Sequence, residues 1–325
     1  MIITRAPLRM SFVGGGSDME AYFSKALGRV ISVTINKYVY IVVKKKFGGG
    51  LRVSYSQTEI CDHVDEIKHE IVRECLKLCE IEDGIEIVSM ADIPGSGSGL
   101  GSSSAFTVAL LMALFRFRGQ SKSQEEIANL ACEVEINRCG APIGKQDQYA
   151  SAIGGLNIFN FHSCGSVSYE KYKLADDIFS NINRHLLVLY TGKTRSASAL
   201  LSEQQKVVLE SSIKRKTISN MVKLIEPCCE TLEQNDMLSF GNIMHKNWML
   251  KKRLTNSISS EWIDLAYEKA IMNGAFGGKI MGAGAGGFFM FISPPNLHNR
   301  ISCKLLMDQM VVKCENGGCK VIFEE

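Results

Sequence analysis

The sequence has few side chains in the arrangements that crosslink a protein through disulfides or metal ions. Its 11 cysteines are odd in number and scattered, none of them forms a CxxC pair, and its 6 histidines show no ligand spacing. We therefore expect neither a disulfide framework nor a zinc site. Unpaired thiols are typical of a reducing compartment.

Long apolar runs and a charge excess of one sign are also lacking. The formal net charge is only +3 and the basic residues are spread along the chain, so neither nucleic acid nor an anionic membrane surface is expected as a partner. The longest apolar run, 105–117, is too short to cross a bilayer, and the N-terminus lacks the layout of a secretory signal. We expect a cytoplasmic protein without membrane contact; a homo-oligomer is compatible with this composition.

The 325 residues are enough for a large core, and two domains are favoured, 1–180 and 181–325, with the polar segment 175–184 at the boundary. Strands and helices are mixed without a strict βαβ alternation, which favours an α+β fold. Periodicity predicts strands at 8–14, 29–45, 51–55, 84–90, 155–161, 166–172, 185–192 and 319–324, helices at 17–26, 65–80 and 105–117, a capping box at Ser123 and Glu126, and three or four helices between about 196 and 273.

The most informative stretch is "PGSGSGLGSSSA", residues 94–105, which leads into the apolar run. Glycines let a ligand lie directly on backbone N–H groups, and a helix start adds unpaired N–H donors and the positive end of its dipole. A helix that is apolar on nearly all sides is buried and holds such donors rigidly. The stretch therefore predicts a phosphate cradle, with a plain glycine-rich turn as the alternative. The cradle residues are Pro94, Gly95, Ser96, Gly97, Ser98, Gly99, Leu100, Gly101, Ser102, Ser103 and Ser104.

This stretch fits neither a Walker loop, because no GxxxxGK precedes Ser or Thr, nor a dinucleotide fingerprint, because another helix follows it. It resembles the phosphate-binding motif of the GHMP kinases, the superfamily of galactokinase, homoserine kinase and mevalonate kinase. "APLRMSFVGGGSD" near the N-terminus resembles the substrate motif of that family, and "KIMGAGAGGFF" near the C-terminus resembles its third motif. Three motifs in this order, spanning Ala6 to Phe289, make the resemblance specific.

The resemblance implies a two-domain α+β fold, with a left-handed βαβ crossover in the N-terminal domain and a ferredoxin-like C-terminal domain. It also implies ATP as phosphoryl donor and Mg2+ as cofactor. Glu135, which by its helical pattern alone reads as a solvated charge, matches the family's magnesium-ligating glutamate when aligned on Pro142. Ser103 matches its metal-binding serine.

The same resemblance assigns catalytic candidates. Asp147 matches the aspartate that many members use as general base, a role that contributes about a hundredfold to ten-thousandfold in rate. Arg9 stands where the first motif carries a lysine or arginine near the reacting atoms, and its planar fork could orient Asp147 or the substrate. Lys145 either acts on Asp147 or phosphate, or is a solvent-facing loop lysine.

Two features concern the phosphoryl acceptor. Asp18 matches the aspartate with which galactokinase-like members hold sugar hydroxyls, although a first-turn aspartate is also favoured by the helix dipole. "YTGKTRSAS" places cations around a helix start, which is either an anion site or a plain capped turn. Glycines replace the Glu and His of galactokinase, which disfavours galactose. The acceptor-binding candidates are Arg5, Gly15, Gly16, Ser17, Asp18, Lys193, Arg195, Ser196, Gly282 and Gly284.

Across nearly the whole chain, the pattern looks most like the D-glycero-D-manno-heptose 7-phosphate kinases. That resemblance implies transfer of the ATP γ-phosphoryl group to the anomeric hydroxyl, giving the 1,7-bisphosphate that feeds nucleotide-activated heptose for surface glycans. A fucokinase-type enzyme acting on an unphosphorylated sugar is the alternative within the family. The pattern is also compatible with a non-catalytic sugar or ATP sensor and with a decarboxylating relative, but the joint presence of Ser103, Glu135 and Asp147 disfavours the sensor.

Overall fold

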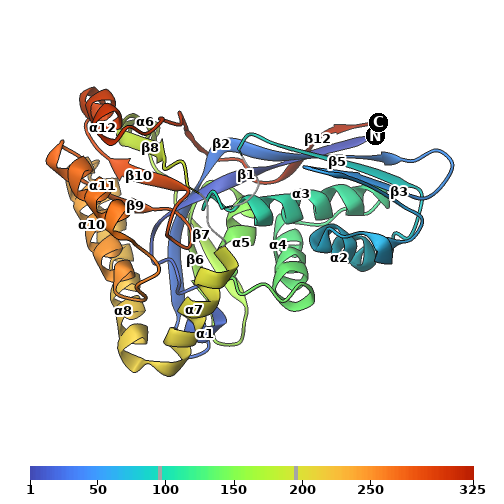
Figure 1. Cartoon of the computed structure of the whole chain (residues 1–325), viewed down its shortest axis with the longest axis horizontal. Coiled ribbons are helices and arrows are strands. Elements are labelled where there is room, and N and C mark those ends of the chain that lie inside the picture. The colour runs from blue at the N-terminus through green and yellow to red at the C-terminus, as the bar shows by residue number, and fades with distance from the viewer. Residues whose placement is uncertain (94–96, 194–196) are drawn as a thin grey trace.

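A large β-sheet forms one half of the molecule, as the computed structural model in Figure 1 shows. The structure describes residues 1–93, 97–193 and 197–325. Within them the sheet runs in the order β12-β1-β2-β5-β3-β4, with β11 and the hairpin β6–β7 beside β2. Its strands are β1 (Ile2–Val13), β2 (Gly28–Lys45), β3 (Leu51–Ser54), β4 (Thr58–Cys61), β5 (Ile85–Ala91), β6 (Leu156–Phe161), β7 (Val167–Lys171), β11 (Cys314–Glu315) and β12 (Lys320–Glu324).

Helix α3 (Ser102–Phe117) lies along one face of this sheet, with α2, α4 and α5 on the same side (Figure 1). Its apolar side chains are buried on nearly every side, and the hydroxyl of Thr4 in β1 donates to the carbonyl oxygen of Ala109 at 2.8 Å. Each buried leucine contributes about 1.5–3 kcal/mol of transfer free energy, so the helix is held firmly, as the sequence predicts. The neighbouring helices are α1 (Glu20–Phe23), α2 (Glu70–Leu78), α4 (Gln124–Cys132), the π-helix η2 (Glu133–Arg138) and α5 (Gln146–Ile153).

A smaller sheet, β8-β10-β9, and most of the later helices form the other side of the molecule (Figure 1). Its core includes the fully buried aromatic side chains of Trp248, Phe289 and Phe291. The last strand, β12, returns to pair with β1, so the two termini lie side by side (Figure 1). The elements are α6 (Asp176–His185), β8 (Leu186–Tyr190), α7 (Ala197–Glu210), α8 (Ser212–Val222), α9 (Ile225–Glu233), α10 (Met237–Lys252), α11 (Glu261–Met272), β9 (Gly277–Ile280), β10 (Phe288–Ile292) and α12 (His298–Leu305).

The predicted α+β mixture is confirmed, and so is the capping box of α4. The Ser123 hydroxyl accepts from the Glu126 N–H at 3.2 Å, and the Glu126 carboxylate accepts from the Ser123 N–H at 2.8 Å. No described helix is both long and apolar enough to span a bilayer. The division into domains at 1–180 and 181–325 remains a prediction.

The polar segment 175–184, predicted as the domain boundary, lies largely in the amphipathic helix α6, with Ile182 buried beneath it, and its role as a boundary stays a prediction. Several predicted helices differ from the structure for local reasons. The described chain from 197 to 272 holds five helices rather than three or four, because Ser211 and Asp236 each cap the start of a new helix with a side-chain oxygen. The first two predicted helices are shorter than their apolar patterns, since α1 and α2 begin only at residues 20 and 70.

Candidate active site

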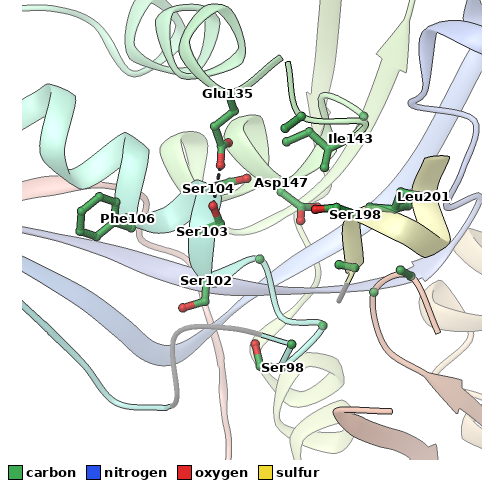
Figure 2. Close-up of a pocket in the computed structure, with 18 of the residues that line it drawn as sticks. Ser98, Ser102, Ser103, Ser104, Phe106, Glu135, Ile143, Asp147, Ser198 and Leu201 are labelled. Atoms are coloured by element: carbon green, nitrogen blue, oxygen red, sulfur yellow. Dashed lines mark hydrogen bonds between the residues drawn. The ribbon is translucent and has the colours of Figure 1, made fainter. Parts of the chain in front are cut away.

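A cavity of about 1350 Å³ lies where the three glycine motifs meet. Figure 2 shows Phe106 at one side and Leu201 of α7 at the other, with Ser103, Glu135 and Asp147 between them. The Phe106 side is aromatic and apolar, and the other side is polar and charged. The lining residues of the polar side include Arg9, Ser11, Gly15, Gly16, Asp18, Gln146, Asp147, Ser198, Lys251 and Gly282.

The predicted phosphate cradle packs backbone against backbone on the third motif. Gly99 has φ +76°, and a Cβ there would lie 2.6 Å from the carbonyl oxygen of Met281. A Cβ on Gly287 would lie 2.4 Å from the carbonyl oxygen of Ser98. Gly101 precedes α3 with φ +75°, a backbone conformation that other residues seldom adopt. The loop is therefore rigid where it enters the helix. Gly97, Ser98, Gly99, Gly101, Ser102, Ser103 and Ser104 line the cavity, Leu100 is fully buried, and Pro94, Gly95 and Ser96 lie outside the described residues.

Glu135 is a buried carboxylate that faces the start of α3. Helix α4 widens into the π-helix η2, a rare local form that is frequent at functional sites. There the Glu135 carboxylate accepts from the Ser103 hydroxyl at 2.8 Å (Figure 2). It also accepts from the Gln148 amide at 2.6 Å. Burial raises the pKa of the Glu135 carboxyl, and these hydrogen bonds oppose the rise. The helical pattern alone indicates that Glu135 is solvent-exposed, and this prediction is wrong. The apolar stripe was read with ordinary α-helical spacing, whereas the π-helix changes which side chains face inward.

Arg9 and Asp147 form a two-pronged ion pair inside the cavity. The Arg9 Nε donates to Asp147 Oδ1 at 2.7 Å, and Nη2 donates to Oδ2 at 2.5 Å. The third guanidinium nitrogen donates to the carbonyl oxygen of Gly99 at 2.7 Å. Arg9 thus ties the carboxylate to the phosphate cradle, and the planar fork gives Asp147 one defined orientation.

Asp18 closes the polar end of the cavity. Its carboxylate accepts from the backbone N–H of Gly16 at 2.9 Å and from that of Gln146 at 3.4 Å. Burial and the nearby charge of Asp147 raise the pKa of the Asp18 carboxyl. A Cβ on Gly144 would lie 2.0 Å from Asp18 Oδ2, so glycine at 144 lets the carboxylate approach this loop.

Several other candidates turn away from the cavity. The Lys145 ammonium donates to the carbonyl oxygen of Gly165 at 2.6 Å, and the Arg5 guanidinium carbon lies 4.3 Å from the ring centre of Tyr38. The Lys193 ammonium lies 4.4 Å from the ring centre of Trp262. Each of these cationic side chains interacts with a residue that is distant in the sequence. Spacing along the chain does not predict such contacts. Arg195 and Ser196 lie outside the described residues.

Two further acceptor-binding candidates, Ser17 and Gly284, make contacts that stabilise the fold. The fully buried Ser17 hydroxyl donates to the carbonyl oxygen of Arg29 at 2.8 Å and accepts from its N–H at 2.9 Å, which joins the first motif to β2. Gly284 packs on Ile258, where a Cβ would lie 2.6 Å from the carbonyl oxygen. Among the described acceptor candidates, the cavity brings together Gly15, Gly16, Asp18 and Gly282.

Sequence reasoning missed Lys251, Lys279 and Gln146. Lys251 was not among the sequence candidates, yet only 5% of its surface is exposed and it lines the cavity. Lys279 is 1% exposed, and its ammonium lies 3.2 Å from the Ser11 hydroxyl. The buried amide nitrogen of Gln146 has no hydrogen-bond partner in the part of the chain that the structure describes. The sequence carries no signal for any of them, because burial depends on how distant elements pack.

Comparison with known proteins identifies the family to which this chain belongs. Residues 67–155 match the family model described as GHMP kinases N terminal domain, and residues 228–305 match GHMP kinases C terminal. The mevalonate kinase of Thermococcus onnurineus is 31% identical, over 84% of this chain and 82% of that protein. The chain therefore belongs to the GHMP kinases, and it is an ATP-dependent phosphotransferase.

Two further relatives match nearly the whole chain. The D-glycero-alpha-D-manno-heptose 7-phosphate kinase of Campylobacter jejuni is 29% identical, over 92% of each chain. The crystal structure of a D-glycero-D-manno-heptose 1-phosphate kinase from Bacteroides thetaiotaomicron has a TM-score of 0.82 at 22% identity, and the match covers 100% of each chain. The latter shows the shared fold, and the predicted GHMP fold class is confirmed.

Proposed function

We propose that this kinase transfers the γ-phosphoryl group of ATP to the anomeric hydroxyl of D-glycero-D-manno-heptose 7-phosphate. The observation that carries the proposal is the Arg9–Asp147 pair, which holds a carboxylate beside the phosphate cradle in a cavity that also contains Asp18. The similarity to the Campylobacter heptose 7-phosphate kinase supports the acceptor. The 1,7-bisphosphate formed would feed nucleotide-activated heptose for surface glycans.

ATP would lie along the cavity with its phosphates at the start of α3. The backbone N–H groups of the first helical turn and the helix dipole favour bound phosphate there. The aromatic end of the cavity suits the nucleobase, because His69 stacks on Phe106 at 5.1 Å between ring centres and Tyr55 meets His69 edge-on at 4.8 Å.

The Ser103 hydroxyl and the Glu135 carboxylate fit Mg2+. Both are hard oxygen donors, they lie 2.8 Å apart, and Glu135 is buried without an ion-pair partner among the described residues. Mg2+ is commonly bound by one or two protein oxygens together with substrate phosphates and water. Bound there, the ion would neutralise charge on the transferring phosphoryl group.

The reaction then needs one proton acceptor and one oriented acceptor molecule. Asp147 takes the proton of the anomeric hydroxyl while that oxygen bonds to the γ-phosphorus, and the bond from the γ-phosphorus to the bridging oxygen of ADP breaks. Arg9 keeps the Asp147 carboxylate in line, and Asp18 accepts hydrogen bonds from sugar hydroxyls. Lys145 has no part in this scheme, because its ammonium is bound to Gly165.

A panel of acceptors tests the proposal. Purified protein is incubated with ATP, MgCl2 and heptose 7-phosphate, unphosphorylated heptose or L-fucose, and ADP release is measured. We expect turnover with heptose 7-phosphate. Turnover with free fucose alone would favour the fucokinase-type alternative, and no turnover with any sugar would favour a sensor.

Gly144→Ala should weaken acceptor binding specifically. The new methyl group would lie 2.0 Å from Asp18 Oδ2 and push the carboxylate from its place. Loss of a hydrogen bond to a charged group raises the acceptor KM by about tenfold or more, while the KM for ATP stays unchanged. The control is Gly119→Ala, whose methyl group meets nothing within 4 Å. Because its φ of +71° strains an alanine, thermal unfolding of both variants is followed to separate backbone strain from an effect on the acceptor. An acceptor KM equal to that of the wild type would contradict the role of Asp18.

A further inference from the structure

Helix α10 carries two buried polar side chains, one turn apart, of which Lys251 lines the cavity. The Asn247 carbonyl accepts from the backbone N–H of Gly14 at 3.3 Å, and the Lys251 ammonium donates to the carbonyl oxygen of Gly282. The helix therefore contacts the first motif through Asn247 and the third motif through Lys251. Because both contacts involve backbone, the position of Lys251 between the two motifs is well defined.

The Lys251 ammonium forms no ion pair with a carboxylate of the described residues. Its only described hydrogen bond goes to a neutral carbonyl, and no ion pair among the described residues includes it. The six residues outside the description contain no Asp or Glu. The next residue, Lys252, in contrast pairs with Asp264 at 2.8 Å outside the cavity. A buried ammonium with no carboxylate in ion-pair contact is costly, so this part of the cavity is complementary to an anion.

Neighbouring groups place this cation on the acceptor side. Burial lowers the pKa of Lys251 to about 8, which still leaves it charged at neutral pH, and Asp18 is the charge that most opposes this lowering. Lys279 from β9 lies behind Ser11, which also lines the cavity. The charge of Asp147 is already matched by Arg9. The cation thus stands beside the carboxylate assigned to sugar hydroxyls.

We propose that the Lys251 ammonium binds the phosphate group that the acceptor already carries, and that it makes the enzyme select a phosphorylated sugar over the free sugar. This inference rests on the proposed function and gives it a specificity residue. The ammonium has three donors, of which Gly282 uses one, so a phosphate oxygen can be bound by a short charge-assisted hydrogen bond. Lys193, which the sequence indicates for this role, is instead held at Trp262.

The test compares phosphorylated and free heptose as acceptors at saturating ATP and MgCl2. Lys251→Met removes the charge and keeps most of the length of the side chain. We expect its KM for heptose 7-phosphate to rise by about tenfold to a hundredfold, with kcat nearly unchanged and with the KM for free heptose unaffected. Lys251→Arg should keep the preference for the phosphorylated acceptor. Lys252→Met, one residue along, is the matched control and should behave as the wild type.

Several results would overturn the proposal. An equal loss with both acceptors, or a fall in kcat at constant KM, would place Lys251 on the transferred phosphoryl group. If Lys251→Met does not fold, the wild type still decides, because equal kcat/KM values for the two acceptors would exclude phosphate selection. A wild type that prefers another phosphorylated sugar contradicts only the heptose assignment, and the same variants then decide on that sugar and its free form. A preference for free sugars contradicts both proposals.

Discussion

Asp147→Asn is expected to reduce turnover by about a hundredfold to ten-thousandfold, the usual contribution of a positioned proton acceptor. The amide keeps the shape of the carboxylate but does not accept the proton of the anomeric hydroxyl. The phosphate cradle is built from backbone of the α3 start, so the affinity for ATP should change little. Turnover is measured by ADP release, and binding of a nonhydrolysable ATP analogue by calorimetry.

The control for this variant removes a carboxylate of another ion pair. Asp264→Asn disrupts the contact with Lys252 at 2.8 Å, outside the cavity, and should leave turnover unchanged. Thermal unfolding is followed for both variants, because Arg9 loses its charged partner when Asp147 is neutralised. Wild-type turnover of Asp147→Asn would show that the hydroxyl proton leaves by another route.

Glu135→Gln is the second substitution with a large expected effect. The carboxylate is replaced by a neutral amide of the same shape, so the Mg2+ site loses its charged ligand. Metal charge stabilisation is worth several kcal/mol, and turnover should therefore fall by about a hundredfold or more. The MgCl2 concentration for half-maximal activity should rise. The unfolding temperature without Mg2+ should not fall, because burial disfavours the charged carboxylate and raises its pKa.

Glu133→Gln provides the matched control for Glu135→Gln. Glu133 lies in the same π-helix, two residues earlier, and faces Arg138 rather than the cavity. Its replacement should change neither turnover nor the dependence on MgCl2. An unchanged dependence on MgCl2 in Glu135→Gln would contradict the assignment of Glu135 and Ser103 to the metal.

Short-range patterns were enough for much of the fold and for the outline of the site. The glycines before an apolar run predict a loop that enters a buried helix, and α3 confirms it. The serine and glutamate three residues apart predict the capping box of α4. The loop before α3 and the capping box depend on residues close together in the chain, so both can be predicted from the sequence. The order of the three glycine motifs was likewise readable, and it indicated the GHMP family.

Long-range packing decided the rest. Arg9 and Asp147 are 138 positions apart, and only the folding of β1 against α5 brings their charged groups together. Lys145 and Lys193 looked suitable by spacing, but Gly165 and Trp262 hold their ammonium groups elsewhere. Lys251 was not singled out from the sequence, yet it is buried and lines the cavity. A charge pattern along the chain reports which groups are present, whereas their exposure and counter-charges are set by elements that meet only in the folded molecule.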